Sequence, residues 1–190
     1  MRHDRYHYWR LKLPAMLWLL LGFDNAACRS FGLMLRTWPD DAYALASRAH
    51  VLAQLGRREQ AIVDAQRLTA LYPARSAADW FNLAFLLEGA GRPGDAEPAF
   101  RRALELDPKL DRAWYGLALV LIRMDRGDEA LAALKRNTEL QPMSPYGWYQ
   151  LARLHADRHD TEAARRIIRH LKDFEPQVAA QLQRETGLAP

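Results

Sequence analysis

The chain has 190 residues, of which 49% are hydrophobic and 26% are charged, and its formal net charge is +4 at pH 7. This balance is that of a folded domain with a sizeable core, and it excludes a chain that is disordered as a whole. Six basic and two acidic residues lie in residues 1–36, so of the totals of 27 and 23 the remaining residues hold 21 basic and 21 acidic side chains. A body with balanced charge is typical of a solvated surface, and nucleic acid is therefore not an expected partner.

The N-terminal segment combines basic residues with a short apolar stretch. Residues 13–23 read LPAMLWLLLGF and are followed by DNAAC, which ends at Cys28, the single cysteine of the chain. This order imitates a lipoprotein export signal. Asn25 is a poor residue for such a signal, and the stretch is shorter than the roughly twenty residues that span a bilayer. The choice between a targeting segment and a part of the fold depends on the pattern further along the chain.

Four later segments share one pattern of large and small residues. They read LASRAHVL from Leu45, WFNLAFLL from Trp80, WYGLALVL from Trp114 and WYQLARLH from Trp148. The tryptophans recur at a constant step, and the same step relates Ala96, Ala130 and Ala164, and also Pro108, Pro142 and Pro176. In each segment the apolar residues fall on one stripe of a helix, and a second helix follows and ends before the proline. Small residues such as Ala118 and Ala130 are expected where the two helices cross.

This pattern resembles the tetratricopeptide repeat, a helix-turn-helix unit whose length of about 34 residues equals the step between the tryptophans. The resemblance implies an all-α fold, a right-handed superhelical solenoid of tandem repeats with a concave binding surface. It predicts complete repeats at residues 42–75, 77–110, 111–144 and 145–178.

The same step extends back into the N-terminal segment. The residues in phase there are Ala15, Gly22, Ala27 and Pro39, and Leu11, Trp18, Phe31 and Met34 fall where the other units carry core residues. We therefore predict a degenerate repeat at residues 8–41 after an extension of residues 1–7, which favours the folded alternative over the export signal. Pro14 would interrupt its first helix, so this helix is predicted to be short and to begin near Leu13 or Pro14, with residues 1–12 loose.

The turns and the C-terminal end have their own signals. Gly56 and Gly91 supply the positive φ that a turn between the two helices needs. Where glycine is missing, as at His159, we expect the turn to be costlier or differently shaped. Residues 179–190 are predicted to form a cap in which Leu182 takes the tryptophan position and Gly187 ends the helix.

No motif in the sequence indicates catalysis, and we expect no enzyme activity, no catalytic residue and no cofactor. His155 and His159, flanked by Asp157 and Asp160, could hold a metal from one helix face. A third ligand is not apparent and His155 falls in a core register, so we expect no metal-binding residue but one packed ring and one ring at the surface.

The candidate partner-binding residues lie on the first helix of each repeat, opposite the core stripe. Aromatic and arginine side chains combine a large contact area with polar tips, as binding hot spots do. The same rings could instead pack between neighbouring helices. The candidates are Tyr43, His50, Phe81, Asn82, Phe85, Arg112, Tyr115, Arg123, Tyr149, Gln150 and Arg153.

These observations predict a cytoplasmic, non-catalytic adaptor or assembly factor that binds a peptide or helix of a partner protein in the concave groove. One alternative is a membrane-associated or periplasmic lipoprotein-like factor, tethered through residues 1–28, that acts in the assembly of an envelope complex. A second alternative is a regulatory module of a neighbouring enzyme.

Overall fold

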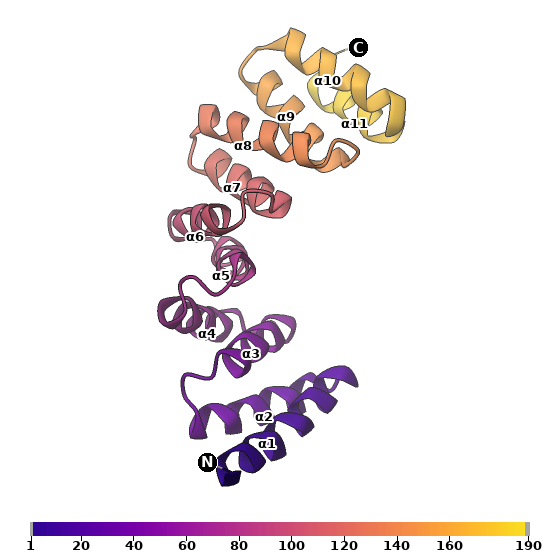
Figure 1. The fold of residues 1–190 in the computed structure, drawn as a ribbon. Coiled ribbons are helices and arrows are strands. Elements are labelled where there is room, and N and C mark those ends of the chain that lie inside the picture. Colours follow the sequence, from indigo (N-terminus) through magenta and orange to yellow (C-terminus); the bar gives the residue numbers. More distant parts are fainter. Residues whose placement is uncertain (1, 189–190) are drawn as a thin grey trace. The chain divides into compact units, whose positions relative to one another are not determined.

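The computed structural model describes the backbone of residues 2–188 and the side chains of residues 5–188, and this part of the chain consists of eleven α-helices without a strand. The chain divides into two compact units, Met1–Leu106 and Asp107–Pro190. Within each unit, consecutive helices run antiparallel and form hairpins that follow one another along the chain (Figure 1). The helices of the first unit are α1 (Arg2–Leu20), α2 (Asp24–Thr37), α3 (Ala42–Gln54), α4 (Arg58–Leu71), α5 (Ala77–Gly89) and α6 (Pro93–Leu106). Those of the second unit are α7 (Asp111–Arg123), α8 (Gly127–Leu140), α9 (Pro145–Asp157), α10 (Thr161–Phe174) and α11 (Pro176–Thr186).

Alanines allow the two helices of each hairpin to pack closely. The second helices place one fully buried alanine at the same register in every hairpin: Ala27, Ala61, Ala96, Ala130 and Ala164. Buried alanines of the first helices are Ala15, Ala49, Ala84, Ala118 and Ala152. The predicted small residues at the helix crossings are therefore confirmed, because side chains this short let the backbones approach.

The three repeated tryptophans have a structural role beyond filling volume. Each is half-buried, and its indole Nε1 donates a hydrogen bond of 2.8–2.9 Å to a proline carbonyl of the preceding connection. The pairs are Trp80 with Pro73, Trp114 with Pro108, and Trp148 with Pro142. The periodicities of tryptophan and proline in the sequence thus have one cause, since the two residues meet where one hairpin joins the next.

The turn within each hairpin has one conformation, whether or not glycine is present. Gly56 has φ of 72°, and His159, in the corresponding place, has φ of 61°. The backbone hydrogen bonds are also equivalent, because Gly56 donates to the carbonyl of Ala53 and His159 donates to that of Ala156. The expectation of a differently shaped turn at His159 is therefore wrong, since the closing hydrogen bonds require the left-handed region there.

Helix α1 is longer than predicted, because it begins at Arg2 and passes through Pro14 without ending. Pro14 is exposed, so water can reach the carbonyl that its missing N–H leaves unpaired. The first half of α1 is held by later segments: the Tyr8 ring lies 5.2 Å from Trp38, and Lys12 Nζ lies 3.9 Å from the centre of the Tyr43 ring. These contacts explain why residues 2–12 are helical and not loose.

The first hairpin has a core of its own, with one exception to the predicted set. Phe31 and Met34 are fully buried, as expected, and Leu11 is partly buried against the core. Trp18 is 37% exposed, which contradicts its predicted core position. The register of Trp18 holds a smaller leucine in each of the next three repeats, as at Leu52, and the larger indole lies outside the core against Phe23, with ring centroids 5.7 Å apart. At the other end of the chain, Gly187 ends α11 with φ of 68°, as predicted, and Leu182 is fully buried.

Candidate partner-binding surfaces

Two of the predicted contact residues in the first unit form an aromatic pair on α5. Phe81 and Phe85 are one helical turn apart, and their rings stack with centroids 6.2 Å apart and an interplanar angle of 21°. Phe81 also lies edge-on to the buried Phe100 of α6, at 6.0 Å. Phe85 is 61% exposed, and Asn82 beside it is exposed as well. The opposite side of α5 packs into the core through Leu83 and Leu87, and the Phe85 ring is exposed on the other side.

The two candidates on α3 differ in their surroundings. Tyr43 is half-buried, with Lys12 Nζ above its ring and the Phe31 ring 5.9 Å away. The structure therefore brings Tyr43 together with α1 and α2, which corresponds to the packing alternative. His50 is exposed on the surface of α3.

In the second unit, the candidates on α9 are covered in part by the C-terminal helix. Tyr149 Oη donates a hydrogen bond of 2.6 Å to Glu185 Oε2 on α11, and the Arg153 guanidinium lies 5.8 Å from the centre of the Tyr149 ring. The bond to Glu185 raises the pKa of Tyr149 and lowers the pKa of Glu185. Glu185 is not among the predicted residues, and the only sequence signal for it is the cap expected after residue 178.

The remaining candidates of the second unit are Arg112, Tyr115 and Arg123 on α7 and Gln150 on α9. The two arginines are exposed, and Tyr115 and Gln150 are half-buried. All four lie on helices whose other side carries buried leucines such as Leu117 and Leu151.

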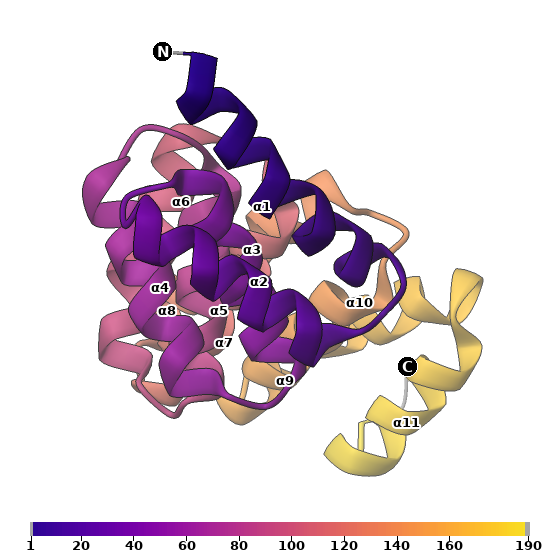
Figure 2. The ribbon, with the colours of Figure 1, turned by 90° about the horizontal axis from the view of Figure 1, so that it is seen from below.

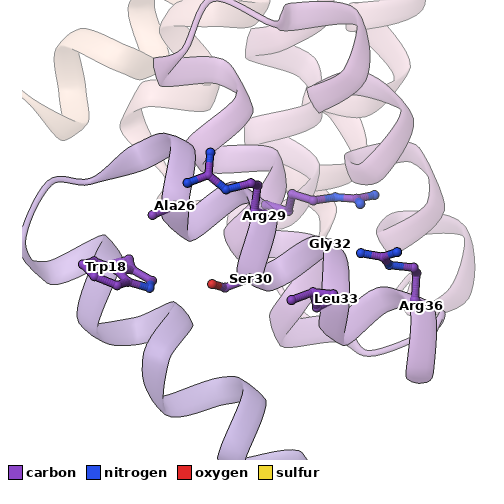
Figure 3. Close-up of a pocket in the computed structure, with 8 residues that line it drawn as sticks. Trp18, Ala26, Arg29, Ser30, Gly32, Leu33 and Arg36 are labelled. Carbon is purple, nitrogen blue, oxygen red and sulfur yellow. The ribbon is translucent and has the colours of Figure 1, made fainter.

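A surface pocket that sequence reasoning missed lies between α1 and α2 and reaches α3 (Figure 3). Its volume is about 630 Å³, and it is lined by Trp18, Ala26, Arg29, Ser30, Gly32, Leu33, Arg36 and Arg48. Pro14 and Ser30 stand in the registers of Arg48 and Asp64, which form an ion pair of 2.6 Å between α3 and α4. The first hairpin lacks this ion pair. In the sequence, the proline at position 14, where the next repeat has an arginine, is the signal that points to the pocket.

The two histidines of α9 and its turn are in the predicted environments. The His155 side chain is 13% exposed, and its Nδ1 lies 2.9 Å from Asp160 Oδ2, whereas His159 is exposed. Among the described residues, no three His, Cys, Asp or Glu side chains are grouped as a metal ion would require. None of the helices in the described part of the chain has the length and apolar character needed to cross a membrane.

Two models of one family match this sequence. Both are described as tetratricopeptide repeat, and they match residues 87–149 in one case and residues 42–62 and 145–170 in the other, together more than half of the chain. The sequence has no match among curated proteins.

Several solved structures share the fold. MamA from Desulfovibrio magneticus RS-1 is 17% identical, with a TM-score of 0.79 over 94% of this chain and 96% of that one. YrrB, described as a TPR protein with an unusual peptide-binding site, is 19% identical, with a TM-score of 0.81 over 90% and 88% of the two chains. A tetratricopeptide repeat protein from Parabacteroides merdae is 18% identical, with a TM-score of 0.82 over 95% and 73%. The fold is thus an all-α helical repeat solenoid, and the chain belongs to the tetratricopeptide repeat family.

Proposed function

We propose that this protein is an adaptor that binds a peptide or helix of a partner protein, with the aromatic pair of α5 as a principal contact. The observation that carries this proposal is the exposure of Phe85, which is 61% accessible although its ring is held in place by Phe81. An apolar ring that is rigid before binding loses little conformational entropy on contact and gains the burial of its free face. Asn82, on the same side of α5, adds an amide that can both donate to and accept from a peptide backbone.

The candidates of the second unit are proposed as a second contact surface. Arg112, Tyr115 and Arg123 lie on α7, and Tyr149, Gln150 and Arg153 lie on α9. Glu185 already places a carboxylate beside Tyr149 and Arg153. An acidic side chain of a partner would be recognised through the same hydrogen bond and the same pairing of charges. YrrB, a protein of similar fold, is described as having a peptide-binding site, which supports this class of function.

Site-specific cross-linking tests the position of the contact. A photoreactive phenylalanine analogue is placed at position 85 in the full chain, in cells, and cross-linked proteins are identified by mass spectrometry. The matched control has the same analogue at position 63, because Val63 of α4 is equally exposed, at 63%. We expect one partner segment to be captured from position 85 and not from position 63.

The affinity of that partner for variants of this protein then tests how much Phe85 contributes to binding. Phe85→Ala should weaken binding by about 10- to 100-fold, the effect of removing an interface hot spot, whereas Val63→Ala should not change it. Equal affinity of Phe85→Ala and the unchanged protein would contradict the proposed contact. Selective capture from position 63 would move the partner site to the surface of α4.

A further inference from the structure

Exposed apolar side chains are concentrated at the N-terminal end of the chain. Of the sixteen large apolar residues that are exposed in the described part of the chain, ten lie between Tyr6 and Leu33. Five of them form what we call the N-terminal apolar face, on the outer side of α1 and at its end: Trp9, Leu13, Leu17, Leu20 and Leu21, while Trp18 lies at the pocket between α1 and α2. Leu20 is 83% exposed. A helix that carries apolar residues nearly all round is normally buried on all sides.

The inner side of α1 is already in use, which limits how a partner can approach. Ala15 is fully buried, and Tyr8, Leu11 and Leu19 pack on the core of the first hairpin. Lys12 lies over the ring of Tyr43 on α3. In Figure 2, α1 and α2 lie in front of α3 and α4, and the outer side of α1 faces away from the rest of the first unit. A partner must therefore meet α1 along its length.

The segment that carries this face also carries the net positive charge of the chain. Residues 1–36 carry six basic and two acidic residues, whereas the charges of the rest of the chain balance. Arg29 and Arg36 are exposed residues of α2 and line the same pocket as Trp18 and Leu33 (Figure 3). Neither arginine forms an ion pair or hydrogen bond with a side chain that the structure describes. The partner should accordingly be both apolar and negatively charged.

We propose that the N-terminal apolar face docks on the surface of an anionic lipid bilayer. A helix lying in the interface buries leucines among the acyl chains, and tryptophans such as Trp9 and Trp18 favour the headgroup level. Arginines at the edge of the face meet the lipid phosphates. A second copy of this chain fits less well, since face-to-face pairing would bring the same basic side chains together. The N-terminal apolar face contains no residue of the aromatic pair on α5, so this proposal does not depend on the adaptor function.

Vesicle co-sedimentation of the full chain tests the proposal. We expect binding to vesicles of phosphatidylcholine and phosphatidylglycerol in a ratio of about two to one, much weaker binding to phosphatidylcholine alone, and a decrease at high salt. Replacing Leu17 and Leu20 together by glutamine should weaken binding by about 10-fold or more, because both side chains lose their apolar contact with lipid. The matched control replaces Val63 and Met143 by glutamine, which changes comparably exposed apolar residues elsewhere (63% and 67%) and should have no effect.

Charge and tryptophan variants complete the test. Arg29→Glu with Arg36→Glu should abolish binding, whereas Lys135→Glu with Arg169→Glu, an equal change of net charge at exposed positions of the second unit, should not. Vesicles should shift the tryptophan emission to the blue, and this shift should be lost when Trp9 and Trp18 are replaced by phenylalanine. Absence of binding to the anionic vesicles, equal loss in the two charge variants, or a dimer in solution that the Leu17 and Leu20 changes dissociate without any vesicle binding would each overturn the proposal.

Discussion

Arg48 of α3 and Asp64 of α4 form a bidentate ion pair inside the second hairpin. Arg48 Nε and Nη2 donate hydrogen bonds of 2.6 Å to the two carboxylate oxygens of Asp64, whose side chain is only 5% exposed. These hydrogen bonds raise the pKa of Arg48. The corresponding positions of the next two repeats hold the apolar pairs Leu83 with Ala99 and Leu117 with Ala133, all of them buried. The ion pair thus replaces an apolar contact that the same fold makes elsewhere.

Removing one partner of this pair should be more harmful than removing both. Asp64→Ala leaves the guanidinium of Arg48, whose side chain is 29% exposed, without its carboxylate, and we expect the free energy of unfolding to fall by about 1–3 kcal/mol. Arg48→Leu combined with Asp64→Ala copies the later repeats and should restore most of that loss, because no partly buried charge is left unpaired. Urea unfolding of the single and double variants measures both values. A double variant as unstable as Asp64→Ala would contradict this account.

The close approach of α8 and α9 makes Gly147 sensitive to substitution. A Cβ there would overlap Oδ1 of Asn137 and lie 3.1 Å from Thr138 Cγ2. Asn137 cannot easily move, since its amide donates a 2.9 Å hydrogen bond to the carbonyl of Asp111. We expect Gly147→Ala to lower the free energy of unfolding by about 1–3 kcal/mol, the cost of overpacking.

A second glycine provides the control for Gly147→Ala. Gly94 lies near the start of α6, and a Cβ added there would meet no atom within 4 Å. Gly94→Ala should stabilise the protein by up to about 1 kcal/mol through helix propensity alone. If thermal unfolding shows that both variants change the stability in the same direction, packing against Asn137 does not control the stability at position 147.

The regular hairpins were predictable because local signals agree with one another. Alanine crossings, glycine turns and the end of α11 at Gly187 all follow from spacing within a repeat. The length of α1 could not be read in this way, because Pro14 argues locally against the helix. The first half of α1 depends on the contact of Lys12 with the Tyr43 ring, and these two residues are distant in sequence and meet only in the fold. The hydrogen bond by which α11 partly covers Tyr149 was missed for the same reason, since Glu185 is 36 residues from Tyr149 in the sequence.

The turns at Asp125 and His159 should be improved by glycine. Both residues have positive φ, 57° and 61°, in the place where Gly22, Gly56 and Gly91 stand in the other hairpins. A left-handed backbone costs a residue with Cβ about 1–2 kcal/mol, and both side chains are exposed. His159→Gly should therefore raise the melting temperature by roughly 2–4 °C for each kcal/mol gained. The reverse change, Gly91→Ala, is the control and should lower the melting temperature; a lower value for His159→Gly would show that its ring stabilises the turn.

The contact between Tyr149 and Glu185 should make the docking of α11 on α9 depend on pH. The hydrogen bond from Tyr149, and then that from Gln181, lowers the pKa of Glu185 below its ordinary value of 4.5. A lowered carboxylate pKa means that the contact stabilises the folded state above about pH 4.5 and that this contribution is lost as the pH falls through the lower folded-state value. Because Glu185 is exposed, we expect a local change in α11 and little change in overall stability.

NMR spectra of α11 amides between pH 7 and pH 3 should show a transition that is absent in Glu185→Gln. Glu162→Gln, which removes an exposed carboxylate on α10, should keep this transition. The same transition in Glu185→Gln would assign the pH dependence to another group and leave α11 held by the burial of Ala179 and Leu182 alone.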